Sequence, residues 1–436
     1  MRITQYSHAF ELPSYPGVIC LFTFLEQGVI FISKERYKDL VNNSFKNLEP
    51  DELLALNQIG ALVNSKEHDY ERLRYYFFKL PFANRIGRLT IVTTYECNMT
   101  CYYCLQNFMS DKDQRLEGVN LQILLEWLPS WIQGNSISEV ELEFIGGEPL
   151  LNMIALKEIC DRVRKTGVRY KGSLITNGSL LDSDLIDSLI EYGITNVQLT
   201  FDGPKDYHDK VKHLGLLESS YDTIREAISV LIEKGCSITL RINYPHKRSD
   251  LAIKTAESLG DIENKEKIIL HFSELFDLGC GLNCDNHEMK HKEKKELFLT
   301  AKNLGFLLPF PFGSIMCKAE ADCNYTITPN LEVYKCYLLL GNESAKVGIL
   351  CKDGIIVQNY RELYRDFNIN CIDCQYYPVC RGGCKVLTYL SSNDESGNTF
   401  HCPKKSLSKD IGEYLSLFIE ANYHKQLETA FSKNGG

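Results

Sequence analysis

The chain of 436 residues contains 17 cysteines, and most of them lie at short, regular spacings. Cys97, Cys101 and Cys104 have the spacing Cys-x3-Cys-x2-Cys. Three thiolates on one short segment can hold three irons of a 4Fe–4S cluster, which leaves the fourth iron without a protein ligand. Such an open coordination site suits a catalytic cluster, because a substrate can bind there. A structural zinc site is the alternative, but it requires a fourth Cys or His, and none follows closely.

A second group of eight cysteines lies nearer the C-terminus. Four of them have the spacing Cys-x2-Cys-x5-Cys-x3-Cys. Eight thiols are enough for two complete 4Fe–4S clusters, and two zinc sites are the alternative. The eight residues are Cys317, Cys323, Cys336, Cys371, Cys374, Cys380, Cys384 and Cys402.

Composition limits the class of protein. Disulfides are disfavoured in the cytosol, so regularly spaced thiols indicate metal ligation. The formal net charge of −9 argues against nonspecific binding to nucleic acid or to an anionic membrane. No segment reaches the roughly 18 apolar residues that span a bilayer, and the N-terminus lacks the pattern of a signal peptide. We therefore expect a cytoplasmic protein with no nucleic-acid or membrane partner.

Residues 88–277 contain the elements that could position the first three cysteines. Strand and helix patterns alternate six times, which is typical of a parallel sheet. Right-handed crossovers can wind six such units into an open (β/α)6 barrel, with ligands at the C-terminal ends of its strands. The predicted strands are Leu89–Thr94, Val140–Ile145, Lys171–Thr176, Asn196–Phe201, Ile238–Asn243 and Lys267–Ser273. Predicted helices between them include Asn120–Trp131, Leu150–Thr166, Asp182–Glu191 and Tyr221–Lys234.

The cysteine triplet follows the first predicted barrel strand, and Tyr103 stands before its last cysteine. The motif Gly146-Gly147-Glu148-Pro149 ends the second strand. Together these features resemble the radical S-adenosylmethionine (SAM) superfamily, in which the second motif contacts the SAM amino group. The resemblance implies that SAM chelates the open iron. It also implies cleavage of SAM to a 5′-deoxyadenosyl radical, which abstracts hydrogen from an unactivated C–H bond.

Further SAM contacts are predicted at the C-terminal ends of the next three strands. There the resemblance points to polar side chains in Thr176-Asn177-Gly178 and Thr200-Phe201-Asp202-Gly203, and to two residues on one face of the fifth strand. Members of the superfamily often have an arginine after a His-Asp pair. Here His208-Asp209 is followed by lysines. The predicted contacts are Thr176, Asn177, Thr200, Asp202, Arg241 and Asn243, together with Tyr103 of the cysteine motif, and the lysines are Lys210 and Lys212.

Residues 278–405 resemble a bridging region followed by a SPASM domain, the C-terminal extension of many peptide-modifying radical SAM enzymes. The resemblance implies two auxiliary 4Fe–4S clusters with interleaved ligands, and so three clusters in all. One departure is Leu331, where the family often has glycine. The implied ligands of the first auxiliary cluster are Cys317, Cys323, Cys336 and Cys384, and those of the second are Cys371, Cys374, Cys380 and Cys402.

Residues 1–87 predict a small winged-helix-like domain. Three strand patterns are followed by three helix patterns, and many SPASM maturases begin with a leader-binding domain of this kind. Such a domain would hold an extended leader peptide by adding it as a strand to a sheet edge. The alternative is a domain that only covers the barrel. Residues 406–436 predict one terminal amphipathic helix, from Ser406 to about Lys433.

These features favour a maturase of a ribosomally made precursor peptide, with leader and core segments. It would form a carbon–carbon, thioether or ether cross-link, and a flavodoxin or ferredoxin would supply electrons. One alternative is an anaerobic sulfatase maturase, which makes formylglycine. In that family an Asp follows the cysteine that corresponds to Cys336, whereas here Tyr337 does, and tyrosine is a poor general base at neutral pH. A further alternative is a regulator that senses redox state with its clusters, which has no use for a SAM site.

Overall fold

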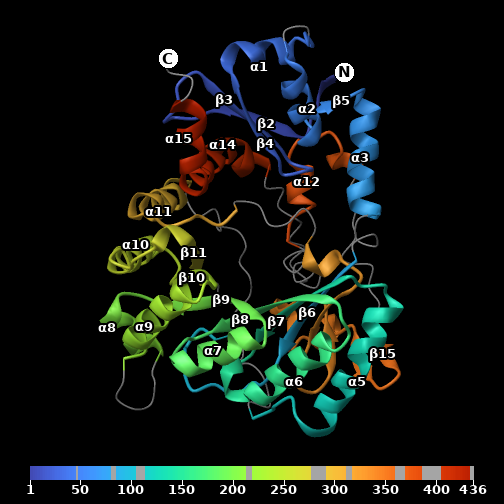
Figure 1. Ribbon diagram of the computed structural model, residues 1–436, viewed down its shortest axis with the longest axis vertical. Coiled ribbons are helices and arrows are strands. Elements are labelled where there is room, and N and C mark those ends of the chain that lie inside the picture. The colour runs from blue at the N-terminus through green and yellow to red at the C-terminus, as the bar shows by residue number, and fades with distance from the viewer. Residues whose placement is uncertain are drawn as a thin grey trace, which may run out of the picture. The chain divides into compact units, whose positions relative to one another are not determined.

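The structure is a computed structural model, and it describes residues 1–45, 48–79, 85–104, 113–212, 219–275, 291–310, 317–358, 369–384 and 404–432. Its contacts divide the chain into two compact units (Figure 1). The first unit comprises Met1–Asn84, Phe310–Asp322 and Glu362–Gly436, and the second comprises Arg85–Pro309 and Cys323–Arg361.

The second unit is built on one ten-stranded sheet, in the order β11-β10-β9-β8-β7-β6-β12-β13-β14-β15. The first six strands in chain order are all parallel to their neighbours. The six strands predicted from the sequence are thereby confirmed, each within a few residues of its predicted bounds. They are β6 (Ile86–Val92), β7 (Glu139–Ile145), β8 (Arg169–Thr176), β9 (Ile194–Phe201), β10 (Ser237–Tyr244) and β11 (Ile268–Glu274).

Helices connect these strands, as the alternating pattern predicts (Figure 1). Several begin at a side chain that accepts a backbone N–H bond, such as Asn152, Asp182 and Ser219, which satisfies one of the free donors at a helix start. The helices are α5 (Gly118–Gly134), α6 (Met153–Arg164), α7 (Ser183–Glu191), α8 (Lys205–Lys212), α9 (Ser220–Glu233), α10 (Ser249–Ser258) and α11 (His291–Leu304), with short 3-10 turns at η2 (Pro149–Asn152) and η3 (Lys265–Lys267).

The two faces of the parallel strands differ in polarity. Phe144, Leu199 and Leu240 lie on one face and are completely buried. Alternate positions point to the opposite face of a strand, and there Glu143 and Arg241 are half-buried. The fold therefore provides an apolar face for the helices and a polar face on the other side of the same strands.

Four short strands extend the sheet beyond β6. β12 pairs with β6 in parallel, and the next three strands pair antiparallel. The sequence pattern does not indicate these strands, because each has only three or four residues. They are β12 (Asn324–Ile327), β13 (Glu332–Tyr334), β14 (Gly348–Cys351) and β15 (Gly354–Val357), with 3-10 turns at η6 (Tyr337–Leu339) and η7 (Glu343–Ala345).

Leu331 lies in the turn between β12 and β13 with a φ of 64°. This is the left-handed region, where a residue other than glycine costs roughly 1 kcal/mol. The side chain is nevertheless buried, so its packing offsets the strain. The turn that glycine would form most easily is thus made with leucine at this position.

The first unit contains a three-stranded antiparallel sheet, β2-β3-β4, followed by helices. Ser33 accepts an N–H bond at the start of α1, and Ser65 does the same for α3. The three predicted strands and three predicted helices are present in that order, but the sequence pattern does not predict β1 and β5. The winged-helix-like identity of the domain stays a prediction. The elements are β1 (Arg2–Ile3), β2 (Ser7–Glu11), β3 (Val18–Thr23), β4 (Val29–Ser33), α1 (Lys34–Val41), α2 (Pro50–Gln58), β5 (Leu62–Val63) and α3 (Lys66–Phe78).

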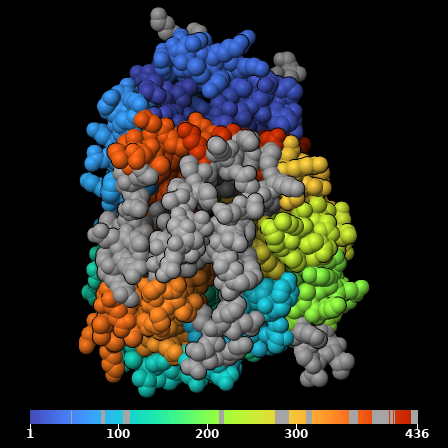
Figure 2. Space-filling model, turned by 180° about the vertical axis from the view of Figure 1, so that it is seen from behind, coloured from blue at the N-terminus to red at the C-terminus, as the bar shows by residue number. Residues whose placement is uncertain are grey.

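The C-terminal part of the chain completes the first unit. Residues 369–384 and 404–432, orange-red to red in Figure 2, lie beside the blue surface of the N-terminal strands. The prediction of one terminal helix is wrong, because the helix is interrupted at Tyr423 and a second helix follows. The elements are η5 (Lys318–Glu320), η9 (Ile369–Cys371), α12 (Tyr377–Cys380), α14 (Lys404–Asn422) and α15 (His424–Ser432).

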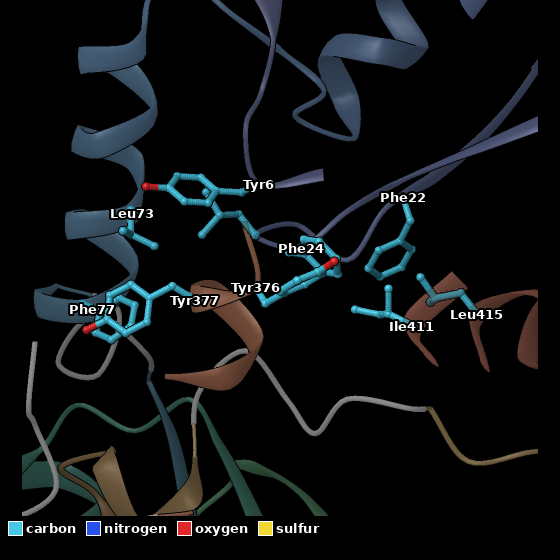
Figure 3. Packing of buried hydrophobic residues seen from close by; sticks show 10 residues of the cluster. Tyr6, Phe22, Phe24, Leu73, Phe77, Tyr376, Tyr377, Ile411 and Leu415 are labelled. Atoms are coloured by element: carbon cyan, nitrogen blue, oxygen red, sulfur yellow. The ribbon is translucent and has the colours of Figure 1, made fainter. Parts of the chain in front are cut away.

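An apolar core joins these distant segments of the first unit (Figure 3). Strand β3 and the residues next to it supply Phe22 and Phe24, α3 supplies Leu73 and Phe77, and α14 supplies residues such as Leu415.

Within the described ranges, no helix is both long and apolar enough to cross a membrane.

Candidate active site

The loop after β6 carries the Cys-x3-Cys-x2-Cys motif. Its start is fixed by a hydrogen bond from the Tyr95 N–H to the Gln114 carbonyl oxygen, at 2.9 Å. The Cys97 sulfur accepts the Met99 N–H at 3.4 Å and lies 3.8 Å from Nδ2 of Asn177. Burial of the thiol raises the pKa of Cys97 to about 11, and the neighbouring Cys101 and Cys104 add to this rise. The three thiols are therefore within electrostatic reach of one another.

These residues fit a cluster with three protein ligands. The donor set consists of three thiols from one loop, and N–H groups face the Cys97 sulfur, as is usual around iron–sulfur clusters. Across the described ranges, no three Cys, His, Asp or Glu side chains already converge on a point as metal ligands. The three cysteines thus match such a cluster in the chemistry of their donor atoms and in their position on one loop.

Gly146 and Gly147 bring the end of β7 close to the cysteine loop. The Gly147 N–H donates to the Thr94 carbonyl oxygen at 2.9 Å, and the Glu148 N–H donates to the Glu96 carbonyl oxygen at 2.8 Å. A Cβ on Gly146 would overlap the Thr94 carbonyl oxygen, and one on Gly147 would overlap that of Glu96. Glycine is therefore needed at both positions for the two backbones to approach.

The Glu148 carboxylate joins the ends of two strands inside the protein. It is completely buried and accepts bonds from the Leu150 N–H, the Thr176 hydroxyl and the Asn177 N–H, at 3.1, 2.7 and 2.9 Å. Burial raises the pKa of Glu148, although these bonds oppose the rise. The Asn177 amide also donates to Asn98 Oδ1 at 2.8 Å. The side chain of Glu148 thus orders β8 against the cysteine loop, while Pro149, also buried, begins η2.

Asp202, at the end of β9, is the centre of a second buried network. Its Oδ1 accepts bonds from the Tyr103 hydroxyl at 2.5 Å and from Asn243 Nδ2 at 3.2 Å. The Asn243 amide also lies 3.2 Å from the Tyr103 hydroxyl. Burial and the Asp202 charge hold the pKa of Tyr103 well above its ordinary value. Three predicted SAM contacts are therefore brought together, with their side chains bonded to one another.

Lys212 is the cation of this network. Its Nζ lies 3.2 Å from Asp202 Oδ2, and both side chains are buried. Burial lowers the pKa of Lys212, but Asp202, Cys101 and Cys97 raise it, and the net shift is upward. Lys210, by contrast, is exposed. The structure therefore identifies Lys212 as the lysine that faces the cysteine loop.

His208 supports the same strand end from the helix that follows. The Asp202 N–H donates to Nδ1 of His208 at 3.2 Å, and Nε2 lies 3.1 Å from the Ser220 hydroxyl. Because Nδ1 accepts, the proton of the neutral ring lies on Nε2. Burial, and then Lys212, lower the pKa of His208 to about 4.

Arg241 on β10 lies next to Thr200 of β9 in register. Its Nε donates to Asn243 Oδ1 at 2.9 Å, and Nη2 donates to the Ser273 hydroxyl at 2.7 Å. Burial raises the pKa of Tyr337, whereas the charge of the nearby Arg241 lowers it, and the net shift is upward. Arg241 thus bonds to Asn243 of the Asp202 network and lies within electrostatic reach of Tyr337.

The cysteines assigned to auxiliary clusters belong to both units. Cys323 and Cys336 lie in the second unit. No disulfide is present among the described cysteines, and the interleaved pairing of ligands stays a prediction. Cys402 lies outside the described residues. The first unit contains Cys317, Cys371, Cys374, Cys380 and Cys384.

Sequence reasoning did not predict two features of the site. It did not indicate that the Glu148 carboxylate accepts three hydrogen bonds from the protein, and the contact of Glu148 with SAM stays a prediction. It also left the role of the two lysines open. The position of Lys212 on α8, four residues after His208, places both side chains on one helix face, and this spacing is the signal that could have selected it.

Comparison with known proteins relates this arrangement to a family. Residues 91–258 match the family model of the radical SAM superfamily. The radical SAM cyclopropyl synthase TigE of Paramaledivibacter caminithermalis is 23% identical over 200 residues, which is 43% of this chain and 40% of that protein. The cysteine-type anaerobic sulfatase-maturating enzyme of Clostridium novyi is 22% identical over 326 residues, 66% of this chain and 85% of that protein.

Two solved structures share the fold. Native anSMEcpe with bound AdoMet and Kp18Cys peptide has a TM-score of 0.56 at 17% identity, covering 80% of this chain and 99% of that one. SuiB of Streptococcus suis bound to S-adenosylmethionine has a TM-score of 0.51 at 14% identity, covering 93% of this chain and 99% of that one. At these identities the likeness concerns the fold.

Proposed function

We propose that this chain, whose residues 91–258 form a radical SAM domain, modifies a ribosomally synthesised precursor peptide and forms a side-chain cross-link. Membership of the superfamily implies a 4Fe–4S cluster and SAM. When bound, they supply hydrogen-atom abstraction from an unactivated C–H bond. Cys97, Cys101 and Cys104 would hold the cluster, and the strand ends around them would hold SAM.

The residues of the Asp202 network would orient SAM. Lys212 is buried beside the cysteine loop, so its ammonium group could bind an anionic group of SAM such as the carboxylate. Asn243 and Tyr103 would keep Asp202 and the loop in place. Thr176 and Asn177 are held by Glu148, so the end of β8 would present backbone and amide groups at a fixed position.

One observation carries the proposal of peptide cross-linking: Tyr337 lies at the ends of the parallel strands, within electrostatic reach of Arg241. It packs beside Val92, Tyr95 and Ile145, and it follows Cys336 directly. A candidate ligand of an auxiliary cluster is thereby next to the strand ends where SAM would bind. This proximity suits a two-electron oxidation, because the second electron needs an acceptor near the substrate.

The eight C-terminal cysteines would hold two auxiliary 4Fe–4S clusters, so that the chain carries three in total. The N-terminal sheet would bind the leader of the precursor. Among the described strands, β4 pairs only with β3, so one edge of this sheet can accept an added strand. A flavodoxin or ferredoxin would reduce the cluster held by Cys97, Cys101 and Cys104.

Formylglycine formation is the second candidate, because a sulfatase-maturating enzyme matches two thirds of the chain. That chemistry needs a general base at the oxidised Cys or Ser. Tyr337 stands at the corresponding place, and its raised pKa keeps it protonated at neutral pH. Tyr337 therefore cannot act as that base.

Mass spectrometry of a co-expressed precursor peptide tests the proposal. A cross-link predicts a loss of about 2 Da and a gap in fragmentation between the joined residues. An aldehyde that reacts with a hydrazine probe, without such a gap, would show that the formylglycine alternative is correct. Intact precursor together with rapid SAM cleavage would point to a different substrate.

A further inference from the structure

The segment that carries Cys371 and Cys374 is held by polar side chains from the N-terminal residues of the same unit. The Ile372 carbonyl oxygen accepts bonds from the Tyr6 hydroxyl at 2.7 Å and from Gln5 Nε2 at 3.2 Å. The two cysteines form a tight turn, because the Cys374 N–H donates to the Cys371 carbonyl oxygen at 2.9 Å. The middle of this turn is therefore bonded to residues more than 360 positions away in the sequence.

The next residue of the turn, Asp373, is bonded to helix α3. Its carboxylate accepts the Tyr70 hydroxyl at 2.5 Å and lies 2.7 Å from Lys66 Nζ. This pair is exposed, so its contribution to stability is small. The pair nevertheless orients the turn so that Asp373 faces α3.

Aromatic packing continues along the segment (Figure 3). Tyr376 packs edge-on against Phe24 with ring centres 5.7 Å apart, and Tyr377 stacks on Phe77 at 4.7 Å. Both tyrosines are buried in the core that joins the N-terminal sheet, α3 and α14. Cys371 and Cys374 pack at the edge of this core.

Arg381 fixes the far side of Cys380. Its guanidinium lies 3.9 Å above the centre of the Phe77 ring, and its Nε donates to Glu320 Oε2 at 2.6 Å. Both side chains of this ion pair are buried. Glu320 belongs to the turn that begins at Cys317, so one arginine links two cysteine-bearing turns to α3.

We infer that residues 1–79 position the cysteine segment 369–384 for cluster ligation, in addition to any role in binding a leader. The segment has only one turn of 3-10 helix and one turn of α-helix of its own, which is too little to fix its cysteines. If the ligands do not already lie near their final positions, metal binding must also order the chain, and this ordering lowers the affinity for metal. Tyr6 and Phe77 supply that order before metal is bound.

This inference rests on the proposed auxiliary cluster at these cysteines. Its test compares two double variants of the full chain. Tyr6→Phe with Phe77→Leu removes one hydroxyl and one ring that touch the segment. The control, Tyr37→Phe with Phe45→Leu, makes the same two changes in the other core of the same N-terminal region, around Leu40 and Leu56.

The first readout is iron per chain after anaerobic reconstitution. We expect the test variant to lose about 4 of about 12 irons while its SAM cleavage rate is unchanged, and the control variant to keep all of them. The second readout is alkylation of Cys371, Cys374 and Cys380 in iron-free chain, followed by mass spectrometry. We expect alkylation about tenfold faster in the test variant than in the control.

Unchanged iron content and unchanged alkylation in the test variant would overturn the inference. Equal losses in both double variants would also overturn it, because they would report general destabilisation of the unit. The alkylation arm separates this inference from the proposed function. If wild-type protein binds only one cluster, the proposal of auxiliary clusters fails, whereas faster alkylation would still establish that residues 1–79 order the segment.

Discussion

Lys212 and Asp202 form a buried ion pair at the end of β9, with Nζ 3.2 Å from Oδ2 and each side chain at most 5% exposed. A buried pair is a weak source of net stability, but removal of one partner leaves an uncompensated charge. The role of such a pair is therefore to fix local geometry or to place a charge. Beside the cysteine loop, Lys212 places a positive charge.

Replacement of Lys212 tests this role. We expect Lys212→Met to weaken SAM binding at least about tenfold, because an anionic group of SAM loses its cation, and to destabilise the fold by about 3 kcal/mol. Lys212→Arg should restore most of the affinity. Isothermal titration with SAM under anaerobic conditions and urea unfolding measure the two effects. Lys210→Met is the matched control, since that lysine is exposed, and an equal loss of affinity there would contradict the assignment.

The strands around this pair could be predicted from sequence, whereas the pair itself could not. β7 and β9 alternate apolar and polar residues and are followed by Gly146 and Asp202, so their existence and their ends are visible locally. The pairing of Lys212 with Asp202 depends on how α8 packs back on the strand end, which is a tertiary relationship. The same holds for β12, which is recognised as a strand only when it pairs with β6.

The cysteine segment of the first unit shows the same limit more clearly. Its ligand spacing is visible in the sequence, and the number of thiols follows from it. That Ile372 bonds to Tyr6 cannot be read from spacing, because more than 360 residues separate them. Short segments without a repeating pattern are positioned by partners that only the folded chain supplies.

Substitution of Gly147 tests the close approach between β7 and the cysteine loop. An alanine Cβ would overlap the Glu96 carbonyl oxygen, so the backbone must move. We expect Gly147→Ala to destabilise the fold by about 2 kcal/mol and to reduce SAM affinity. Gly134→Ala is the control, because its Cβ would meet no neighbour and alanine favours helix. Urea unfolding of both variants measures the difference, and equal stability would show that the loop can relax.

Acid should destabilise the protein through His208. Its pKa is lowered to about 4 in the folded chain, against an ordinary value of about 6.5. Between these values the unfolded chain binds more protons, so stability rises with pH from 4 to 6.5 and is level above that range. From pH 7.5 to pH 5 this histidine should cost about 2 kcal/mol.

The variant His208→Gln isolates this contribution. Glutamine can accept the Asp202 N–H and donate to Ser220, as the neutral imidazole does, but it does not titrate. We expect its urea-unfolding free energy to fall less between pH 7.5 and pH 5 than that of the wild type, by about 2 kcal/mol. Loss of metal at low pH affects both proteins alike and cancels in this difference. Identical pH profiles would mean that the pKa of His208 is the same in the folded and unfolded chains, so that the ring is protonated in the folded chain at pH 5.

The cysteine triplet should account for one third of the iron. Simultaneous replacement of Cys97, Cys101 and Cys104 by alanine is expected to remove about 4 of about 12 irons and all SAM cleavage. Iron is measured by chelation after acid release, and cleavage by chromatography of 5′-deoxyadenosine. Replacement of Cys160, a buried residue of α6, is the control and should leave the iron unchanged. Stoichiometric zinc without iron in anaerobically purified wild-type protein would refute the cluster.

Tyr337 is expected to influence the product rather than SAM cleavage. Burial raises its pKa, with Arg241 nearby on the polar face of the sheet, so its hydroxyl can donate a hydrogen bond but cannot take a proton at neutral pH. Tyr337→Phe removes the hydroxyl and keeps the ring that packs beside Val92 and Ile145. We expect this variant to cleave SAM at the wild-type rate and to give about tenfold less cross-linked peptide, because the substrate is less well positioned.

Parallel quantification of 5′-deoxyadenosine and of the product that is about 2 Da lighter separates the two effects. An equal fall in both would place Tyr337 in SAM binding, and unchanged yields would mean that only its ring matters.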